Sequence, residues 1–523
     1  MNKQDAKAGD LAQYNKILGD SGLFFPGPSK GSFIFPSNGL ILWQNIQNIL
    51  NQKFAKYEVK NVSLPTLIPY SFFQKEKQHI QGFSPEFFQI QQIGEKKLTE
   101  PLVLRPTSEV LFYDWFRQIL RSYQQLPFLY NQWCQVFRAE KNTKPFLRNT
   151  EFFWQEGHTL HETAEEAQEF AQKIWQEYQN YAEKNLGLAV IAGKKSENEK
   201  FAGALESYTV ECLLPDGQCL QLATSHYFGD NFCQATGVKF QNQQNQFQHP
   251  FSTSWGTSTR AIGAIASTHA DNWGIILPFD VAPVQIAFIL IREEKELINY
   301  YQEILNILVS AKFRCQLYNK NKQVNLNILQ ADKEGCPLKI ILGMEELKKR
   351  EITLIRRDNV EKKITINIES SEVEKKSFAI FEKYMEELNK GKVKKELEKL
   401  AKKNKNPVYS FKGGAILSKV FGSITEEVEE LKKNIYQKSA DFRDNHTYSI
   451  DNYSELQEKI NKEIKGLFLI PFCNNLSCEK TIPQKLPAYS IRCLSLNNKP
   501  KEKEKCVFCA TPAANYAFLG RSY

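Results

Sequence analysis

The sequence contains no run of about 20 consecutive apolar residues, the length that a helix needs to cross a bilayer. Its first twenty residues carry Asp5 and Asp10 among other polar residues, so they do not form the apolar segment of a signal peptide. A strong charge of one sign is also absent, because the formal net charge is only +9 over 523 residues. These absences predict a soluble cytoplasmic protein without a membrane span, and they give slight support to a polyanionic partner.

Closely spaced cysteines are absent until the end of the chain. Six scattered cysteines are predicted to be reduced thiols: Cys134, Cys212, Cys219, Cys233, Cys315 and Cys336. The segments "CNNLSC" and "CVFC" then supply two pairs, Cys473 with Cys478 and Cys506 with Cys509. Their spacing predicts a structural zinc site with four thiolate ligands, although Cys493 is an alternative ligand and metal-free thiols are an alternative state.

The length of the chain, with 42% hydrophobic residues, predicts about three domains. Residues 1–278 are rich in aromatic residues and alternating apolar runs, whereas 279–364 contain βα units that predict a small α/β domain with a mostly parallel sheet. Residues 365–420 are predicted to form a charged linker or insertion, for which an RNA-contacting patch is the alternative, and 421–523 a C-terminal domain.

Two alternating runs, "QVFRAE" and "RNTEFFWQE", are joined by a short polar segment and predict an antiparallel hairpin. The period of two places Phe152, Trp154 and Glu156 on one face, and it places Arg138 and Glu140 together. Aromatic rings suit a purine, and the planar fork of a guanidinium suits a phosphate or a carboxylate. An ordinary sheet with an exposed ion pair explains this stretch equally well when it is taken alone.

Two further segments favour a nucleotide site. In "VLRPTSE", Thr107 and Glu109 follow a turn-forming proline and precede a helical run, so a hydroxyl and a carboxylate project together. In "SWGTSTRAIGAI", small residues surround Arg260 and allow close backbone approach. Together with the hairpin, these elements predict an anion-binding site within residues 1–278.

The segments "FRAE", "RNTEF" and "GTSTRAIGAI" resemble motifs 2 and 3 of class II aminoacyl-tRNA synthetases, and Pro65 in "SLPTLIP" fits the motif 1 proline. The segments "LRPTSE", "NQWC", "FWQEGHT", "ATSHYFGDNF" and "GRSY" resemble prolyl-tRNA synthetases of the archaeal and eukaryotic type, over nearly the whole chain. The resemblance implies an α+β protein with a class II antiparallel-sheet catalytic domain, an α/β anticodon-binding domain and a small α/β zinc-containing C-terminal domain. It also implies a homodimeric enzyme that uses ATP and Mg²⁺ to activate L-proline and then charges tRNA(Pro).

The resemblance assigns roles to individual residues, and it implies that Arg138, Arg260 and Glu109 are catalytic. The predicted proline contacts are Thr107, Glu109, Arg138, Phe83, Trp154, His158 and His226. The predicted ATP contacts are Arg138, Glu140, Arg148, Asn149, Phe152, Gln221, Thr224, Ser258 and Arg260. The predicted magnesium ligands are Gln221 and Glu211.

This chain departs from the family pattern at several places. Asn149 stands where the family often has a threonine that contacts the nucleotide, so nucleotide affinity is the property most affected. In the anticodon domain, Asp332 and Lys339 occupy positions where the family usually has a glutamate and an arginine that read guanines, and ordinary loop and strand charges are the alternative. Between residues 150 and 255 there is no room for the large editing insertion of bacterial-type relatives. Residues 365–420 do not match the family.

Two other functions are consistent with parts of the sequence. Another class II synthetase, of the threonyl or seryl type, is disfavoured by "TSE" and "WQEGH". A non-catalytic synthetase-like RNA-binding protein is disfavoured because Arg138, Glu140 and Arg260 are all present.

Overall fold

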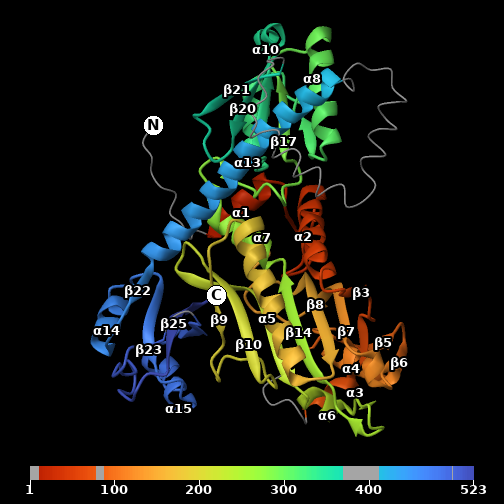
Figure 1. Ribbon diagram of the computed structural model, residues 1–523, viewed down its shortest axis with the longest axis vertical. Helices are drawn as coiled ribbons and strands as arrows, with labels where there is room; N and C mark the ends of the chain where they lie inside the picture. The colour runs from red at the N-terminus through yellow and green to blue at the C-terminus, as the bar shows by residue number, and fades with distance from the viewer. Residues whose placement is uncertain (1–10, 78–86, 369–410, 497–498) are drawn as a thin grey trace.

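The computed structural model describes residues 11–77, 87–368, 411–496 and 499–523. It comprises a large central sheet with helices on it, a smaller α/β domain above, and a C-terminal region beside the sheet (Figure 1). Phe83 and residues 369–410 of the predicted linker lie outside the described residues. No helix in the described part of the chain is both long and apolar enough to span a bilayer.

The central sheet has eleven strands in the order β22-β23-β25-β24-β9-β10-β11-β14-β8-β7-β3. Their bounds in chain order are β3 Lys60–Val62, β7 Phe128–Phe137, β8 Glu151–His161, β9 Val190–Lys194, β10 Glu206–Leu213, β11 Gln218–Gly229, β14 Phe251–Ser258, β22 Thr447–Ser449, β23 Leu467–Phe472, β24 Tyr489–Leu494 and β25 Asn515–Ser522. Strands β9 to β7 pair antiparallel throughout. The predicted hairpin is confirmed as β7 and β8, with Phe137 opposite Glu151.

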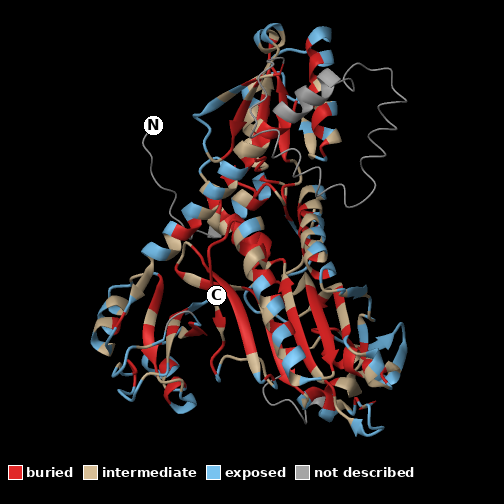
Figure 2. Cartoon of the chain, viewed as in Figure 1, coloured by how far each residue is buried: buried red, intermediate tan, exposed pale blue. Residues whose placement is uncertain are grey.

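Four helices cover this sheet and bury its apolar side chains (Figure 2). They are α1 Leu11–Asp20, α2 Ser37–Ala55, α5 Ala164–Asn180 and α7 Arg260–Thr268. In α2, Leu42, Ile46 and Leu50 recur every four residues and are fully buried, which is the stripe expected of a helix packed on a sheet. Helix α5 begins where the Thr163 hydroxyl accepts a hydrogen bond from the Glu166 N–H at 3.2 Å.

Shorter elements surround the sheet. Their bounds are β1 Phe25–Pro26, β2 Phe33–Ile34, β4 Leu67–Pro69, α3 Tyr70–Lys77, β5 Gln89–Ile93, β6 Lys96–Leu104, α4 Glu109–Ile119, η1 Tyr123–Gln125, η2 Tyr181–Asn185, α6 Asn231–Thr236, β12 Phe240–Gln241, β13 Phe247–Gln248, β15 Ala270–Asp271 and β16 Gly274–Ile275. Strands β4, β6 and β5 form a separate three-stranded sheet that leads into α4. Residues 105–108 therefore connect this small sheet to the helix that carries Glu109.

The smaller domain has a five-stranded sheet in the order β18-β17-β19-β20-β21. Its elements are β17 Ile286–Leu290, α8 Lys295–Ser310, β18 Cys315–Leu317, α9 Val324–Lys333, β19 Leu338–Leu342, α10 Met344–Lys349, β20 Glu351–Arg356 and β21 Lys363–Asn367. β17 pairs parallel with β18 and β19, but the remaining two pairings are antiparallel, so the prediction of a mostly parallel sheet is wrong. The connection from β19 to β20 is too short for a parallel crossover, which needs about a dozen residues.

Helix α13 (Phe411–Asn445) links the three regions. Its apolar residues Val420, Ile424 and Leu431 join the core of the smaller domain. Further along, the Ser439 hydroxyl accepts a hydrogen bond from the backbone N–H of Ala189, next to the central sheet, at 2.9 Å. The boundary predicted between residues 420 and 421 therefore falls inside a continuous helix, because one apolar stripe crosses it.

The C-terminal region contains β22 to β25 with α14 Tyr453–Asn461, α15 Leu476–Glu479 and α16 Ile482–Lys485. Its strands do not form a sheet of their own. β24 pairs with β9 at Leu494 and Lys194, and β25 runs parallel to β11 at Gln218 and Arg521. The C-terminal region therefore extends the sheet that carries the central cavity.

Leu431→Ala tests the packing of α13. Leu431 is fully buried in the smaller domain's core, so the change should lower the free energy of unfolding by about 2–5 kcal/mol through lost burial and the cavity left behind. Thermal or urea unfolding measures this loss. The matched control is Lys433→Ala, at an exposed position of the same helix, which should change stability by less than about 0.5 kcal/mol. Equal stability of the two variants would contradict this packing.

Candidate active site

A cavity of about 250 Å³ opens on the face of the central sheet formed by β8, β11 and β14. Eleven of the residues predicted from the sequence line it: Thr107, Glu109, Arg138, Phe152, Trp154, His158, Gln221, Thr224, His226, Ser258 and Arg260. They come from segments separated by up to about 150 positions in the chain, so the fold gathers the predicted motifs around one space.

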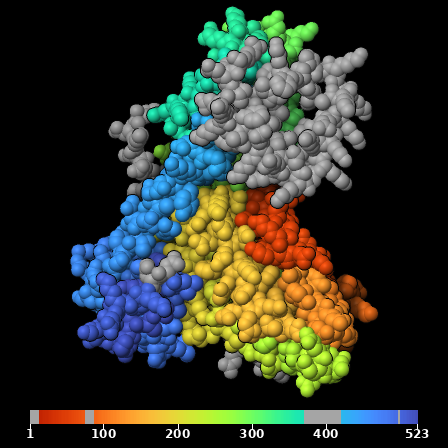
Figure 3. Space-filling model, viewed as in Figure 1, coloured from red at the N-terminus to blue at the C-terminus, as the bar shows by residue number. Residues whose placement is uncertain are grey.

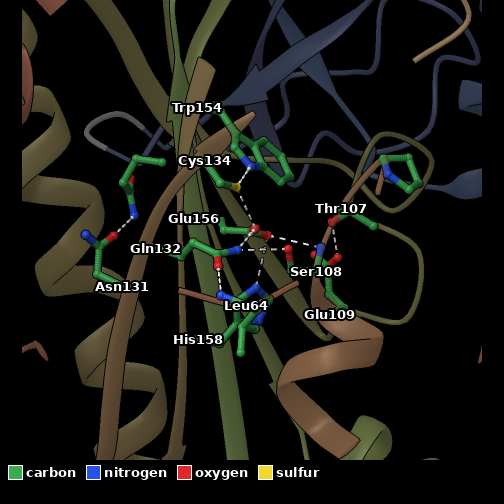
Figure 4. Close-up of polar contacts among 12 residues, drawn as sticks. Leu64, Thr107, Ser108, Glu109, Asn131, Gln132, Cys134, Trp154, Glu156 and His158 are labelled. Atoms are coloured by element: carbon green, nitrogen blue, oxygen red, sulfur yellow. Dashed lines mark hydrogen bonds and ion pairs between the residues drawn. The ribbon is translucent and has the colours of Figure 1, made fainter. Parts of the chain in front are cut away.

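The start of α4 brings a hydroxyl and a carboxylate into the cavity (Figure 4). The Thr107 hydroxyl donates to Glu109 Oε2, and both side chains are buried. Glu109 is the first residue of α4, where the positive end of the helix dipole favours its negative charge. The Arg138 Nε donates to the Pro106 carbonyl at 3.1 Å, which fixes this loop against the end of β7.

Glu156 is a second buried carboxylate on the cavity wall that the sequence analysis did not assign to the site. Its oxygens accept from Gln132 Nε2 at 2.9 Å and from the Ser108 N–H at 3.2 Å, and His158 Nε2 lies 3.5 Å away (Figure 4). Burial would raise the pKa of Glu156, but contacts with His158, Ser108 and Gln132 outweigh it and lower that pKa. The alternation of β8, which puts Glu156 on the face of Trp154, was the signal that could have found it.

Glu109, Glu156 and His158 each place a potential metal-ligand atom within 4.8 Å of the others. Hydrogen bonds from Thr107 to Glu109 and from Gln132 to Glu156 already use carboxylate oxygens that could otherwise bind a metal ion. The same two carboxylates form a negatively charged wall that fits an ammonium group. The geometry favours binding of an ammonium group over binding of a metal ion, because hydrogen-bond donors of the protein already orient each carboxylate.

Two arginines, Arg138 and Arg260, also line the cavity. The Arg138 guanidinium lies over the rings of Trp154 and Phe152, with centroid distances of 5.2 and 5.7 Å. Burial lowers the pKa of Arg138. Burial, followed by the charges of Arg138 and Arg148, lowers the pKa of Arg260 to about 10. Two partly buried guanidinium groups, of which Arg138 disfavours the charge of Arg260, create a site that an anion would stabilise.

The two histidines on the wall differ in their contacts. His226 Nδ1 lies 2.8 Å from the Ser207 hydroxyl. Burial, with smaller contributions from His158 and the charge of Lys195, lowers the pKa of His226 to about 3, so this ring is neutral at physiological pH. His158 stacks on Phe112 with the ring centroids 4.2 Å apart. His226 therefore offers an uncharged surface to a ligand.

Three predicted ATP contacts do not line the cavity. Glu140, Arg148 and Asn149 lie in or beside the loop between β7 and β8, where Arg148 Nε is 3.8 Å from Glu140 Oε2. Arg148 Nη2 also donates to the Tyr523 carbonyl at 3.2 Å. Asn149 is buried. Their roles in nucleotide binding stay predictions.

The magnesium role predicted for Glu211 does not fit the structure. Glu211 is fully buried and does not line the cavity. One of its oxygens takes the Lys195 ammonium at 2.5 Å and the other takes Arg492 Nε at 2.8 Å. Two cations therefore occupy the carboxylate that the sequence analysis assigned to Mg²⁺. Gln221 does line the cavity.

The four predicted zinc ligands lie together in the C-terminal region. Cys473, Cys478, Cys506 and Cys509 place their sulfur atoms within 4.8 Å of one another. The Cys478–Cys506 and Cys473–Cys509 sulfur distances are 3.9 and 3.6 Å. Four sulfurs at about 2.3 Å from a tetrahedral Zn²⁺ would be roughly 3.8 Å apart, so the donor set fits this ion. The alternative ligand Cys493 is fully buried in a different apolar cluster.

The predicted anticodon contacts form a buried pair instead of an exposed one. Lys339 is 1% exposed at its side chain and donates to Asp332 Oδ1. Arg357 adds a second cation, with its Nε 3.6 Å from the same oxygen. The prediction that Lys339 presents its ammonium to a base is therefore wrong, because its side chain on β19 points into the domain, toward Asp332.

Comparison with known proteins defines the class first. Residues 45–269 match the tRNA synthetase class II core domain (G, H, P, S and T), 281–376 match an anticodon binding domain, and 453–523 match the prolyl-tRNA synthetase C-terminal domain. The central sheet and its cavity thus belong to a class II synthetase, and the predicted fold class is confirmed.

Curated relatives give the family. A proline--tRNA ligase of Mycoplasma mycoides is 38% identical, covering 98% of this chain and 97% of its own. Proline--tRNA ligase 2 of Bacillus thuringiensis is 35% identical, covering 98% and 97%. The crystal structure of a Cryptosporidium parvum prolyl-tRNA synthetase with halofuginone and AMPPNP aligns with a TM-score of 0.85 at 28% identity, over 99% of this chain and 96% of that one. A second structure of that enzyme, with L-proline and AMP, has a TM-score of 0.83 at 27% identity, over 100% and 96%. This chain belongs to the proline--tRNA ligase family.

Cys506→Ser tests the four-cysteine site. Loss of one thiolate should reduce the zinc content of the purified protein to well below one equivalent and destabilise the C-terminal region, because metal binding and folding are coupled. Elemental analysis under reducing conditions measures the metal. Cys493→Ser is the control, since Cys493 lies outside the cluster and its loss should leave the zinc content unchanged. Wild-type protein without zinc would contradict the assignment.

Proposed function

We propose that this chain activates L-proline with ATP to form prolyl-adenylate and then transfers the prolyl group to tRNA(Pro). The observation that carries the proposal is that one cavity wall holds groups of both charges, the carboxylates of Glu109 and Glu156 and the guanidinium groups of Arg138 and Arg260. Proline is a zwitterion, so its ammonium suits the carboxylates while its carboxylate suits Arg138. The triphosphate extends the negative charge toward Arg260.

Formation of prolyl-adenylate requires positioning of the reactants and stabilisation of charge more than proton transfer. The proline carboxylate attacks the α-phosphorus, the bond to the β-phosphate breaks, and pyrophosphate leaves with the electron pair. Arg138 would contact both reacting anions and hold them in line, and the Phe152 ring would stack on adenine. Arg260 would stabilise the negative charge of the leaving group. The rings of Trp154 and His158 would cover the apolar proline ring.

Mg²⁺ would neutralise phosphate charge during this step. An amide oxygen is a suitable ligand, and Gln221 is the cavity residue that would hold the ion together with phosphate oxygens. Glu211 is not included, because its carboxylate is already taken by two cations. The zinc ion, held by the four cysteines, would be structural and remote from the reaction.

The archaeal/eukaryotic subtype and the homodimer expected from the sequence are part of the proposal. The first is supported by the segment from Thr150 to Trp255, whose strands all pair within the central sheet or form the short β12–β13 hairpin. No separate domain lies in this segment, all of which the structure describes. Sedimentation of the purified protein tests the dimer.

Arg138→Ala and Glu109→Gln should fail differently in proline-dependent ATP–pyrophosphate exchange. Arg138 meets both anions in the transition state, so its loss should reduce kcat by roughly 100-fold or more. Glu109→Gln keeps the side-chain shape but loses the charge that meets the ammonium, so it should mainly raise the KM for proline.

The control for these variants is Arg117→Ala. Arg117 is a half-exposed arginine that pairs with Asp114 on α4 and does not line the cavity. Its exchange rate should equal that of the wild type. If Arg138→Ala also retained wild-type exchange, the cavity would not be the site of adenylate formation. Exchange with threonine or serine but not proline would replace the proposed substrate.

Because the segment from residue 150 to residue 255 holds no separate domain that could edit, we expect this chain to mischarge tRNA. Alanine and cysteine fit a proline pocket and differ from proline by contacts worth only about 1–3 kcal/mol, so measurable misactivation is expected. Mischarged alanyl-tRNA(Pro) should persist when incubated with the pure protein, at the same rate of loss as in buffer. Rapid deacylation by the protein would show that a hydrolytic site exists in this chain.

A further inference from the structure

Three charged side chains form a buried chain between the cavity and the C-terminal region. Glu211 on β10 is fully buried, and its two oxygens take Lys195 Nζ at 2.5 Å and Arg492 Nε at 2.8 Å. The side chains of Lys195 and Arg492 are only 5% and 6% exposed. Burying three charges is costly unless each is paired, so removal of one leaves the others uncompensated. The three residues therefore act as one unit.

Strand pairing brings the two ends of this unit together. β9 and β24 pair at Lys194 and Leu494, which lie one residue from Lys195 and two residues from Arg492 along the chain. The approach is close enough to require a glycine, because a Cβ at Gly193 would lie 2.3 Å from the Leu494 carbonyl. The space-filling view shows the C-terminal residues, in blue, packed against the yellow residues of the central region (Figure 3).

Lys195 is the end of the unit that reaches the cavity. It lines the cavity wall together with Phe201, Ser207 and His226. These neighbours belong to the part of the wall where His226 is predicted to contact proline. Arg492, at the other end, lies in the C-terminal region next to the buried Cys493 and does not line the cavity.

We infer that Arg492 is a positioning residue for amino-acid binding: it holds Glu211, and Glu211 holds the Lys195 ammonium at the cavity wall. The inference rests on the proposed function and deepens it, because Arg492, Glu211 and Lys195 would connect the C-terminal region to the amino-acid site. This connection does not involve the four cysteines. Without Arg492, one oxygen of Glu211 loses its partner and the carboxylate reorients, which carries Lys195 away from the wall.

Proline-dependent ATP–pyrophosphate exchange by Arg492→Met, Lys195→Met and the double variant tests this path. Each single change should raise the KM for proline about tenfold, with kcat and the KM for ATP within about twofold of the wild type. The double variant should be no worse than either single variant, because both changes break the same path. KM increases that multiply in the double variant, or an unchanged KM in Arg492→Met, overturn the inference.

Two further variants separate positioning from folding. Arg443→Met removes a different long-range contact with β9, in which Arg443 Nη1 on helix α13 donates to the Val190 carbonyl at 3.0 Å, and it should leave the KM for proline unchanged. Arg492→Lys keeps the buried positive charge and should bring the KM to within about threefold of the wild type. If Arg443→Met raised the KM for proline as much as Arg492→Met, Arg492 would have only a structural role. Thermal unfolding would then show that both variants are destabilised. If the wild type shows no proline-dependent exchange, the proposed function fails and the inference fails with it.

Discussion

The antiparallel pairing of β8 between β7 and β14 is the constraint on which the site depends. Successive side chains of a strand point to opposite faces, so this pairing sends Phe152, Trp154, Glu156 and His158 to one face of the sheet. A shift of one residue in the register would turn all four away from the cavity and bury their neighbours there instead. The long ladders on both sides of β8 make such a shift unfavourable.

That scaffold also places groups of both charges around the cavity. Strand β8 supplies Glu156 and helix α4 supplies Glu109, while the arginines come from the end of β7 and the start of α7. Each group is oriented by a protein partner, as in the hydrogen bond from Arg138 to the Pro106 carbonyl. Such preorganisation lets a zwitterion and a polyanion bind side by side without a large rearrangement of the protein.

The three regions of the chain are also mechanically connected. α13 places one apolar stripe in the core of the smaller domain and then reaches the central sheet. The C-terminal strands extend that sheet, and the buried unit of Lys195, Glu211 and Arg492 joins them to the cavity wall. The smaller domain is held by a further pair, in which Arg357 donates to both oxygens of Asp271 at 2.7 Å. Substrate binding and the outer regions therefore share a rigid frame.

The resemblance to a known family supplied half of the residues that line the cavity. The sequence by itself determined the β7–β8 hairpin and the grouping of the four cysteines. These features depend on local rules, namely a period of two, turn residues and ligand spacing, which a short window of sequence contains. Only the tertiary structure decided the partners of buried charges, such as Glu211 with Arg492, which is 281 positions away. The same holds for Lys339, whose charge faces inward toward Asp332. Burial and long-range pairing set the role of a charged residue, and neither is visible until the chain is folded.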